Sequence, residues 1–137
     1  MSNNTIETIR SPPTGAGDII KGDIIWVDFR FVKPLIDIEG RIKGTSKERP
    51  ALVIYNERRQ LVVAYITSRL LFVPDPADVS VLENNASFET TGLKNSSIIK
   101  LGVVYTVSRD DVLGWIGYVD DALRAEINAK LAKYFRI

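Results

Sequence analysis

The feature that most constrains the fold is a series of short β-branched and aromatic runs, followed by one helical pattern at the C-terminal end. Turn residues separate the runs, as between strands of a small barrel or sandwich. The strongest runs predict strands at residues 24–31, 49–55 and 61–67. Weaker runs predict short strands or extended pieces at 79–82, 88–91, 97–101, 103–107 and 115–119.

The patterns within these runs predict how each strand is buried. Trp26, Asp28 and Arg30 alternate with apolar residues in 24–31, which is typical of a half-buried strand. The run at 61–67 is almost continuously apolar and is therefore expected at the centre of the sheet. Gly102 splits the runs at 97–107 and predicts a bulge or bend. The polar, glycine-containing segment 33–48 predicts no regular element.

The last part of the chain predicts an α-helix at residues 122–135. Leu123, Ile127, Leu131 and Tyr134 recur at helical spacing and form one apolar stripe. Either Asp120 or Asp121 can serve as the N-cap. The expected fold class is mainly β with a C-terminal helix. An SH3-like barrel fits best, although periodicity alone does not select it.

The length of 137 residues fits one domain. Residues 1–16 are rich in polar residues, proline and glycine, and predict a flexible N-terminal arm. Residues 17–137 then form the single folded domain. No apolar stretch approaches the length of a membrane span or of a signal-peptide core, which predicts a cytoplasmic protein without membrane contact.

The chain contains neither cysteine nor histidine. This excludes disulfide scaffolds, zinc ribbons, thiol nucleophiles, Ser-His-Asp triads and imidazole metal sites. An enzyme with this composition must use Arg, Lys, carboxylates, hydroxyls or Tyr. The formal net charge of +1 also means that any nucleic-acid contact must come from a local basic patch.

Several blocks of sequence occur together in an order that resembles a known family. They are GDIIWVDF at 22–29, RPALVI at 49–54, ITS at 66–68, Gly92-Leu93 with 96–100, and Ile116-Gly117 before the terminal helix. The set resembles the MazF/PemK (Kid) family of toxin–antitoxin endoribonucleases from about Gly17 onward. The resemblance implies an SH3-like barrel of the MazF/PemK/CcdB type, a homodimer, and a cognate antitoxin partner. It also implies cleavage of single-stranded RNA without a metal ion or cofactor.

The resemblance also implies which residues carry the chemistry. The family reaction is attack of a ribose 2′-OH on the adjacent phosphorus, and it places negative charge on the phosphoryl oxygens. Arg49 matches the family's catalytic arginine, whose guanidinium suits two phosphate oxygens. Thr67 matches the catalytic threonine, and Ser68 next to it is a supporting hydroxyl.

The general base is less well defined by the sequence. Arginine is a poor base because its guanidinium stays protonated in proteins, so Glu48, directly before Arg49, is the candidate carboxylate. Many family members carry a Gly-Ser-Glu-Gln-type stretch before this arginine. The corresponding stretch here, GTSKE at 44–48, departs from that pattern.

A local excess of basic residues surrounds the predicted site, as an RNA-binding face requires. The predicted RNA-binding residues are Arg41, Lys43, Lys47, Arg58, Arg69 and Lys94, and Lys100 can extend the patch. Trp26 and Trp115 are interpreted as core or interface residues, with RNA stacking as the alternative for an exposed ring. A non-catalytic binding module or gyrase-poison-like toxin on the same barrel is the alternative function, because a fold does not fix activity.

Overall fold

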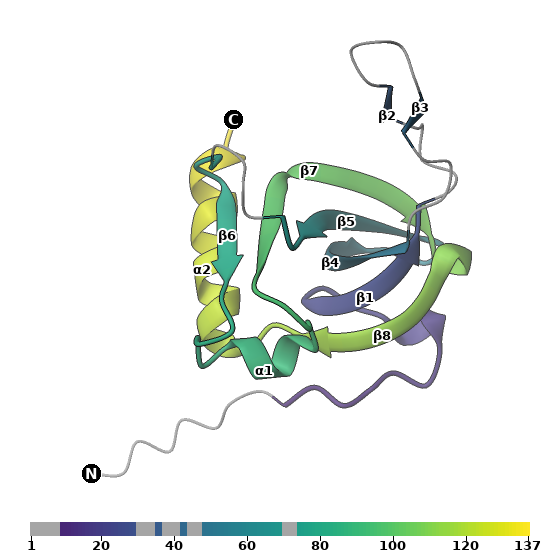
Figure 1. The fold of residues 1–137 in the computed structure, drawn as a ribbon. Coiled ribbons are helices and arrows are strands. Elements are labelled where there is room, and N and C mark those ends of the chain that lie inside the picture. Colours follow the sequence, from purple (N-terminus) through teal and green to yellow (C-terminus); the bar gives the residue numbers. More distant parts are fainter. Residues whose placement is uncertain (1–8, 30–34, 37–41, 44–47, 70–73) are drawn as a thin grey trace.

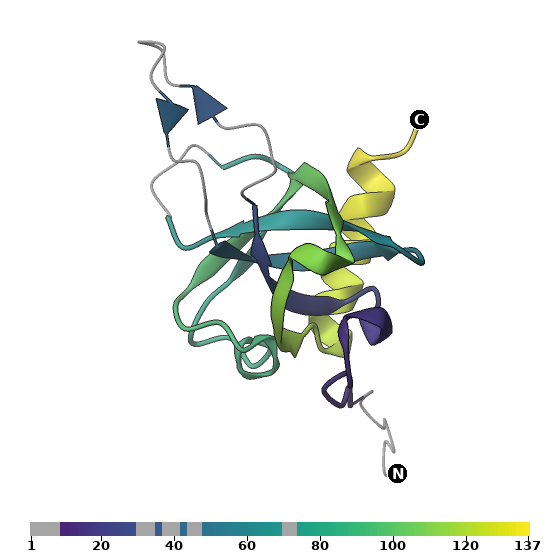
Figure 2. The same cartoon turned by 90° about the vertical axis from the view of Figure 1, so that its right-hand side faces the viewer.

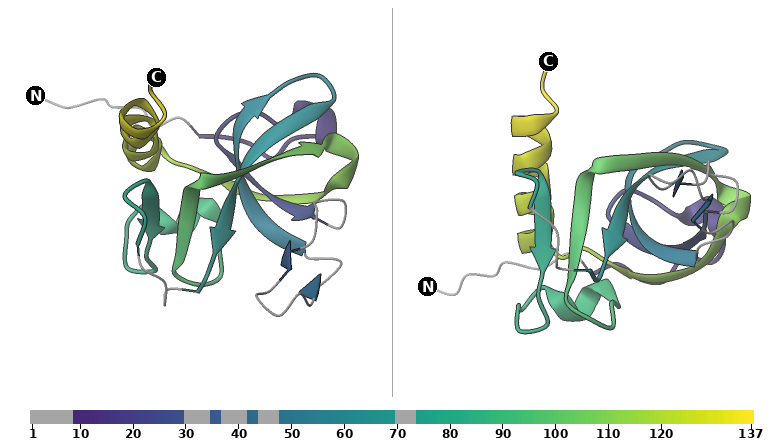
Figure 3. Two further views of the ribbon diagram at one scale, coloured as in Figure 1. Left: turned by 90° about the horizontal axis from the view of Figure 1, so that it is seen from above. Right: turned by 45° about the horizontal axis from the view of Figure 1, so that its top comes forward.

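The computed structural model describes residues 9–29, 35–36, 42–43, 48–69 and 74–137. Its main feature is a six-stranded antiparallel sheet with strand order β6-β7-β5-β4-β1-β8. These strands are β1 (Asp23–Asp28), β4 (Glu48–Asn56), β5 (Gln60–Thr67), β6 (Asp78–Val81), β7 (Ser97–Ser108) and β8 (Val112–Tyr118). The sheet curls into an open, barrel-like shape (Figures 1 and 3). This confirms the mainly β fold with a C-terminal helix that the sequence predicted.

The remaining elements are short, apart from the C-terminal helix. Two two-residue strands, β2 (Leu35–Ile36) and β3 (Ile42–Lys43), pair within the segment in which no element was predicted. Helix α1 covers Phe88–Thr91, and α2 covers Asp121–Tyr134. Single 3₁₀ turns occur at Ala16–Asp18 and Arg109–Asp111. Neither α-helix in the described part of the chain is long and apolar enough to cross a membrane.

Two clusters of buried side chains lie on the two faces of the central strands. Ile25, Val53 and Val63 belong to the cluster inside the curved sheet, whereas Ile24 and Leu52 belong to the cluster that includes residues of α2. Since successive side chains of a strand leave opposite faces, β1, β4 and β5 each carry buried side chains on both faces. This explains the almost continuous apolar run in β5, and it confirms that β5 is a central strand.

Helix α2 packs along the outside of the sheet beside β6 (Figure 1). Asp120 is the N-cap, since its carboxylate accepts a hydrogen bond from Leu123 N at 2.9 Å. Leu123 and Ile127 are buried against the sheet, and Lys130 Nζ donates to the carbonyl of Asp78 at 2.5 Å. Tyr134, the last member of the predicted apolar stripe, is 42% exposed.

The other differences from the sequence prediction concern short segments. Residues 88–91 were expected to be extended but form α1, because Thr91 Oγ1 donates to the Phe88 carbonyl and Gly92 ends the turn in the left-handed conformation. Strand β8 begins at Val112 rather than near residue 115. The bend predicted at Gly102 is confirmed, because the β5–β7 register shifts between the pairs Ala64–Val104 and Tyr65–Lys100.

The segment before β1 is held to the barrel by a buried ion pair. The Asp23 side chain is 1% exposed and accepts two hydrogen bonds from the Arg10 guanidinium, both at 2.9 Å. Arg10 also donates to the Asp18 carbonyl. The hydrogen bond to Asp23 raises the pKa of Arg10 above its ordinary value. The stability that the charged guanidinium contributes is therefore complete below its ordinary pKa, and is lost only as the pH rises through the raised value.

Replacing Arg10 by alanine is expected to reduce the free energy of unfolding by about 3 kcal/mol, because it leaves the buried Asp23 carboxylate without its counter-ion. Urea unfolding monitored by circular dichroism measures the change. Arg58→Ala is the matched control, because Arg58 is exposed and no ion pair joins it to the described residues. Equal stabilities of the two variants would show that the pair does not hold the segment in place. The domain boundary at residues 16 and 17 stays a prediction.

Candidate active site

A pocket of about 370 Å³ opens where the start of β4, the end of β5 and the loop after α1 meet. Its polar lining comes from Arg49, Ser68, Lys94, Asn95 and Ser97. These residues are far apart in the sequence, and the antiparallel pairing of β1, β4, β5 and β7 brings them together. The rest of the lining is mostly apolar and consists of Trp26, Pro50, Ile66, Gly92, Leu93 and Ile116.

Arg49 is the central cation of this pocket. It is the second residue of β4 and lies opposite Val27 of β1. Its side chain is half-buried. Its Nε atom is buried and has no hydrogen-bond partner among the described residues. A buried donor without a partner is uncommon and costs free energy. The guanidinium is therefore placed to bind an anion that enters the pocket.

The end of β5 supplies the hydroxyl groups. Ile66 and Ser68 line the pocket, whereas Thr67 between them does not. This follows from the alternation of side chains along the strand. The Thr67 hydroxyl instead accepts a hydrogen bond from Arg69 N at 3.1 Å. Ser68 is exposed and lines the same pocket as Arg49.

The loop after α1 forms the facing wall and is held rigidly. Gly92 has φ +71°, and a Cβ atom on it would lie 1.8 Å from the Ile116 carbonyl oxygen of β8. Ser97 Oγ donates to the Asn95 carbonyl at 2.8 Å, and Leu93 N donates to Thr91 Oγ1 at 3.3 Å. Lys94 is the only predicted site residue in this loop. Asn95 and Leu93 were not predicted, although Gly92-Leu93 is one of the blocks that carried the resemblance.

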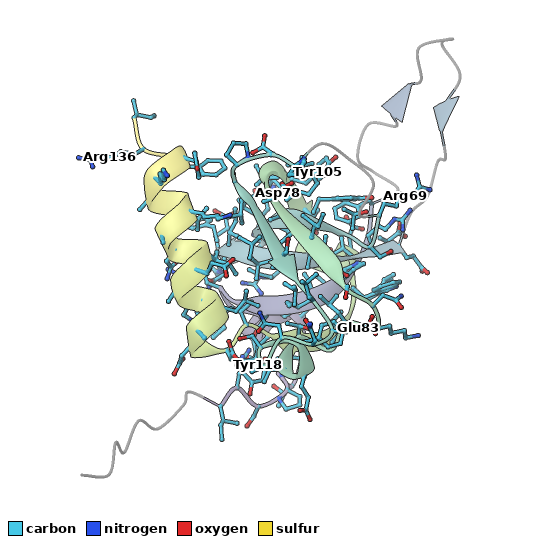
Figure 4. The ribbon with its side chains drawn as sticks, turned by 60° about the vertical axis from the view of Figure 1, so that its left-hand side comes forward. Arg69, Asp78, Glu83, Tyr105, Tyr118 and Arg136 are labelled. Atoms are coloured by element: carbon cyan, nitrogen blue, oxygen red, sulfur yellow. The ribbon has the colours of Figure 1, made fainter. Side chains whose placement is uncertain are left out.

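Three other predicted residues, Glu48, Arg58 and Arg69, do not line the pocket. Glu48 is exposed at the start of β4 and, as the neighbour of Arg49 in a strand, directs its side chain to the opposite face. Arg69 projects outward just beyond β5 (Figure 4). Arg58 lies in the turn between β4 and β5, at the opposite end of β4 from Arg49. This turn projects at the right of Figure 2.

The remaining predicted basic residues are either paired or not described. Lys100 Nζ forms an ion pair with the buried carboxylate of Asp78 at 3.0 Å, which holds it on the β6–β7 side of the sheet. Arg41 and Lys47 lie outside the described residues, and Lys43 is described only as part of the β3 backbone. Among the described residues, no three acidic, histidine or cysteine side chains form a group that could hold a metal ion.

Comparison with known proteins identifies both a family and a set of related folds. The sequence profile described as "PemK-like, MazF-like toxin of type II toxin-antitoxin system" matches residues 20–135. No curated protein sequence matches the chain significantly. Among solved structures, the Mycobacterium tuberculosis toxin MazF-mt6 superposes with a TM-score of 0.58 at 18% identity, covering 84% of this chain and 97% of that one.

Two further solved structures contain antitoxins. One is an endoribonuclease in complex with its cognate antitoxin from a mycobacterial species, with a TM-score of 0.58, 16% identity, and coverage of 85% of this chain and 94% of that one. The other is MazE–MazF from Deinococcus radiodurans, with a TM-score of 0.56, 15% identity, and coverage of 93% and 99%. At these identities, the structural likeness establishes the fold alone.

Proposed function

Because this chain belongs to the PemK-like, MazF-like toxins of type II toxin–antitoxin systems, we propose that it cleaves single-stranded RNA at the Arg49 pocket. Solved structures with the same fold include proteins described as endoribonucleases, which supports this assignment. The proposed reaction is a metal-independent transesterification. The ribose 2′-oxygen attacks the adjacent phosphorus, and the P–O5′ bond breaks. The products are a 2′,3′-cyclic phosphate and a 5′-OH.

The observation that carries the proposal is the buried Nε of Arg49, which has no partner among the described residues. A phosphate group supplies the acceptor oxygens that this guanidinium lacks. During the reaction, negative charge gathers on the non-bridging oxygens. A cation already held in position stabilises this charge without reorganisation. Ser68, which lines the same pocket, offers a second hydrogen-bond donor, and Lys94 adds positive charge.

Two proton transfers complete the reaction: the 2′-OH loses a proton and the leaving 5′-oxygen gains one. Glu48 was the candidate base, but it is not among the residues that line the pocket. We therefore assign to Arg49 and Ser68 the stabilisation of charge and not the proton transfers. In this account, catalysis by the described residues is mainly electrostatic.

The hydroxyl groups of Thr67 and Ser68 are expected to contribute differently to kcat. Ser68→Ala should lower kcat about 100-fold, because it removes a hydroxyl donor that lines the pocket with Arg49. Thr67→Ala should have a smaller effect, because the Thr67 hydroxyl accepts from Arg69 N and acts by shaping the strand end. Single-turnover cleavage of one RNA by both variants measures the two effects. A larger loss for Thr67→Ala would reverse the assignment of the two hydroxyls.

The solved complexes of related folds with antitoxins support a corresponding partner here. We propose that a cognate antitoxin binds this chain and blocks the pocket, and that the toxin acts as a homodimer in the cytoplasm. Co-expression with the gene adjacent to that of the toxin, followed by co-purification and sedimentation analysis, tests both the partner and the oligomeric state.

The proposed activity is tested by incubating the purified protein with several long RNAs in EDTA and analysing the ends of the fragments by mass spectrometry. We expect cleavage that leaves cyclic-phosphate and 5′-OH ends. Cleavage only after addition of a divalent ion would overturn the metal-independent reaction. No cleavage by the folded protein would instead favour a non-catalytic binding module, such as a toxin that acts on a protein target.

A further inference from the structure

The pocket around Arg49 is larger and more apolar than a phosphate group requires. A phosphate needs only the polar groups of Arg49, Ser68 and Lys94. The remaining wall is built mainly from Trp26, Leu93 and Ile116, with the side chain of Asn95 at its edge. Ligand pockets that join an apolar surface to a few polar groups bind ligands of the same mixed character. The apolar wall is therefore expected to bind a second, less polar part of the same ligand.

The neighbours of Trp26 leave its ring accessible. Trp26 of β1 lies opposite Pro50 of β4 on one side and opposite Gly114 of β8 on the other. Gly114 has no side chain, and the space that a Cβ atom would occupy there is open. The indole is half-buried and lines the pocket. An aromatic ring in such a position offers a flat surface on which a planar group can stack.

Asn95 adds a hydrogen-bonding group to this surface. Its side chain is exposed, and no hydrogen bond joins its amide to the described residues. Its backbone, in contrast, is held by Ser97, whose side chain is buried. The close contact of Gly92 with the Ile116 carbonyl fixes the start of the same loop. The loop thus presents a free carboxamide from a preformed position, which limits the ordering cost of binding.

We propose that this wall is a subsite for the nucleobase that adjoins the scissile phosphate, and that Trp26 and Asn95 determine the preference for that base. The inference rests on the proposed nuclease function. Its basis is the juxtaposition of a phosphate-binding guanidinium, an accessible indole and an unpaired carboxamide in one pocket. Single-stranded RNA is recognised through bases that stack on aromatic rings and hydrogen-bond along their edges, and all three groups match one nucleotide.

The test measures base preference directly. An RNA pool with a randomised single-stranded segment is cleaved, and the new ends are sequenced. Wild-type protein is expected to prefer one base at one position next to the cut. Asn95→Ala should weaken that preference about tenfold and leave the preferences at other positions unchanged. Asn128→Ala, on the exposed face of α2, is the matched control and should change nothing.

The role of Trp26 is tested by measuring the effect of its replacement on KM and on kcat separately. Trp26→Leu should raise the KM for a single RNA about tenfold, with a smaller change in kcat, because stacking is lost. Compared with Trp26→Leu, Trp26→Phe should keep most of the affinity for RNA, because phenylalanine still offers a ring for stacking. If the substitutions acted only by a general loss of structure, the two variants would not differ in this way. Circular dichroism and urea unfolding of both variants establish that they fold.

The outcomes separate this inference from the function on which it rests. If wild-type protein cleaves RNA but Asn95→Ala keeps its base preference and Trp26→Leu keeps its KM, the nucleobase subsite is wrong and the nuclease stands. The wall would then be a surface for protein contact. If folded wild-type protein neither cleaves RNA nor binds a 2′-deoxy analogue of it, both the nuclease and the subsite are wrong.

Discussion

Replacing Arg49 by alanine is expected to slow RNA cleavage about 1000-fold while leaving the fold intact. Loss of a single fixed donor at a developing oxyanion typically costs about 100- to 1000-fold, and Arg49 supplies both donors and a positive charge. The fold should survive because the Arg49 side chain is only half-buried and its Nε has no partner among the described residues. Single-turnover kinetics and circular dichroism measure the two properties.

Two further variants sharpen this prediction. Arg49→Lys keeps the charge but loses the planar pair of donors, and should recover only a small part of the rate. Arg136→Ala is the matched control, because Arg136 is exposed beyond the C-terminal end of α2, on the opposite side of the molecule from Arg69 (Figure 4). Cleavage by Arg49→Ala within about tenfold of wild type would be too small a loss for a residue that stabilises the transition state.

Replacing Gly92 by alanine is expected to lower the free energy of unfolding by about 3 kcal/mol or more, since two costs add. The first cost is the left-handed backbone, φ +71°, which an alanine adopts reluctantly. The second is steric, since the new Cβ would lie 1.8 Å from the Ile116 carbonyl oxygen. The colliding atom belongs to the backbone of β8, so it cannot move aside as a flexible side chain would.

The same substitution at Gly102 provides the control. Gly102 lies in the bend of β7, where a Cβ atom would meet open space and φ is not positive. Gly102→Ala should therefore change the stability little. Urea unfolding of both variants gives the comparison. Equal unfolding free energies would show that the loop after α1 is not fixed against β8, and the preformed wall of the pocket would lose its basis.

The sequence predicted the strands and the terminal helix well because their signals are local. The alternation around Trp26 and the apolar run at 61–67 each report how a strand is buried. Asp120 precedes an apolar stripe at helical spacing, and the structure confirms it as the N-cap. Helix α1 was missed because it is a single turn held by Thr91 and Gly92, and too short to show a period.

The candidate site was predicted in part, mainly through the resemblance to a family. Arg49, Ser68 and Lys94 were named and do line one pocket. Composition and spacing alone did not select them, because the walls are joined only by strand pairing. Asn95 was missed for the same reason, and the accessibility of Trp26 was left open between a core position and an exposed stacking ring. Both depend on contacts between residues distant in sequence, such as Gly92 with Ile116 and Trp26 with Gly114.

The most direct test of the account compares two RNA oligonucleotides that differ by one atom. One carries the normal 2′-OH at the nucleotide before the cleaved bond, and the other carries a 2′-deoxyribose there. The account predicts that the toxin cleaves the first in EDTA, leaves a 2′,3′-cyclic phosphate, and does not cleave the second. Cleavage of the 2′-deoxy oligonucleotide at the same bond would show that water or another nucleophile attacks the phosphorus, and would contradict the proposed reaction.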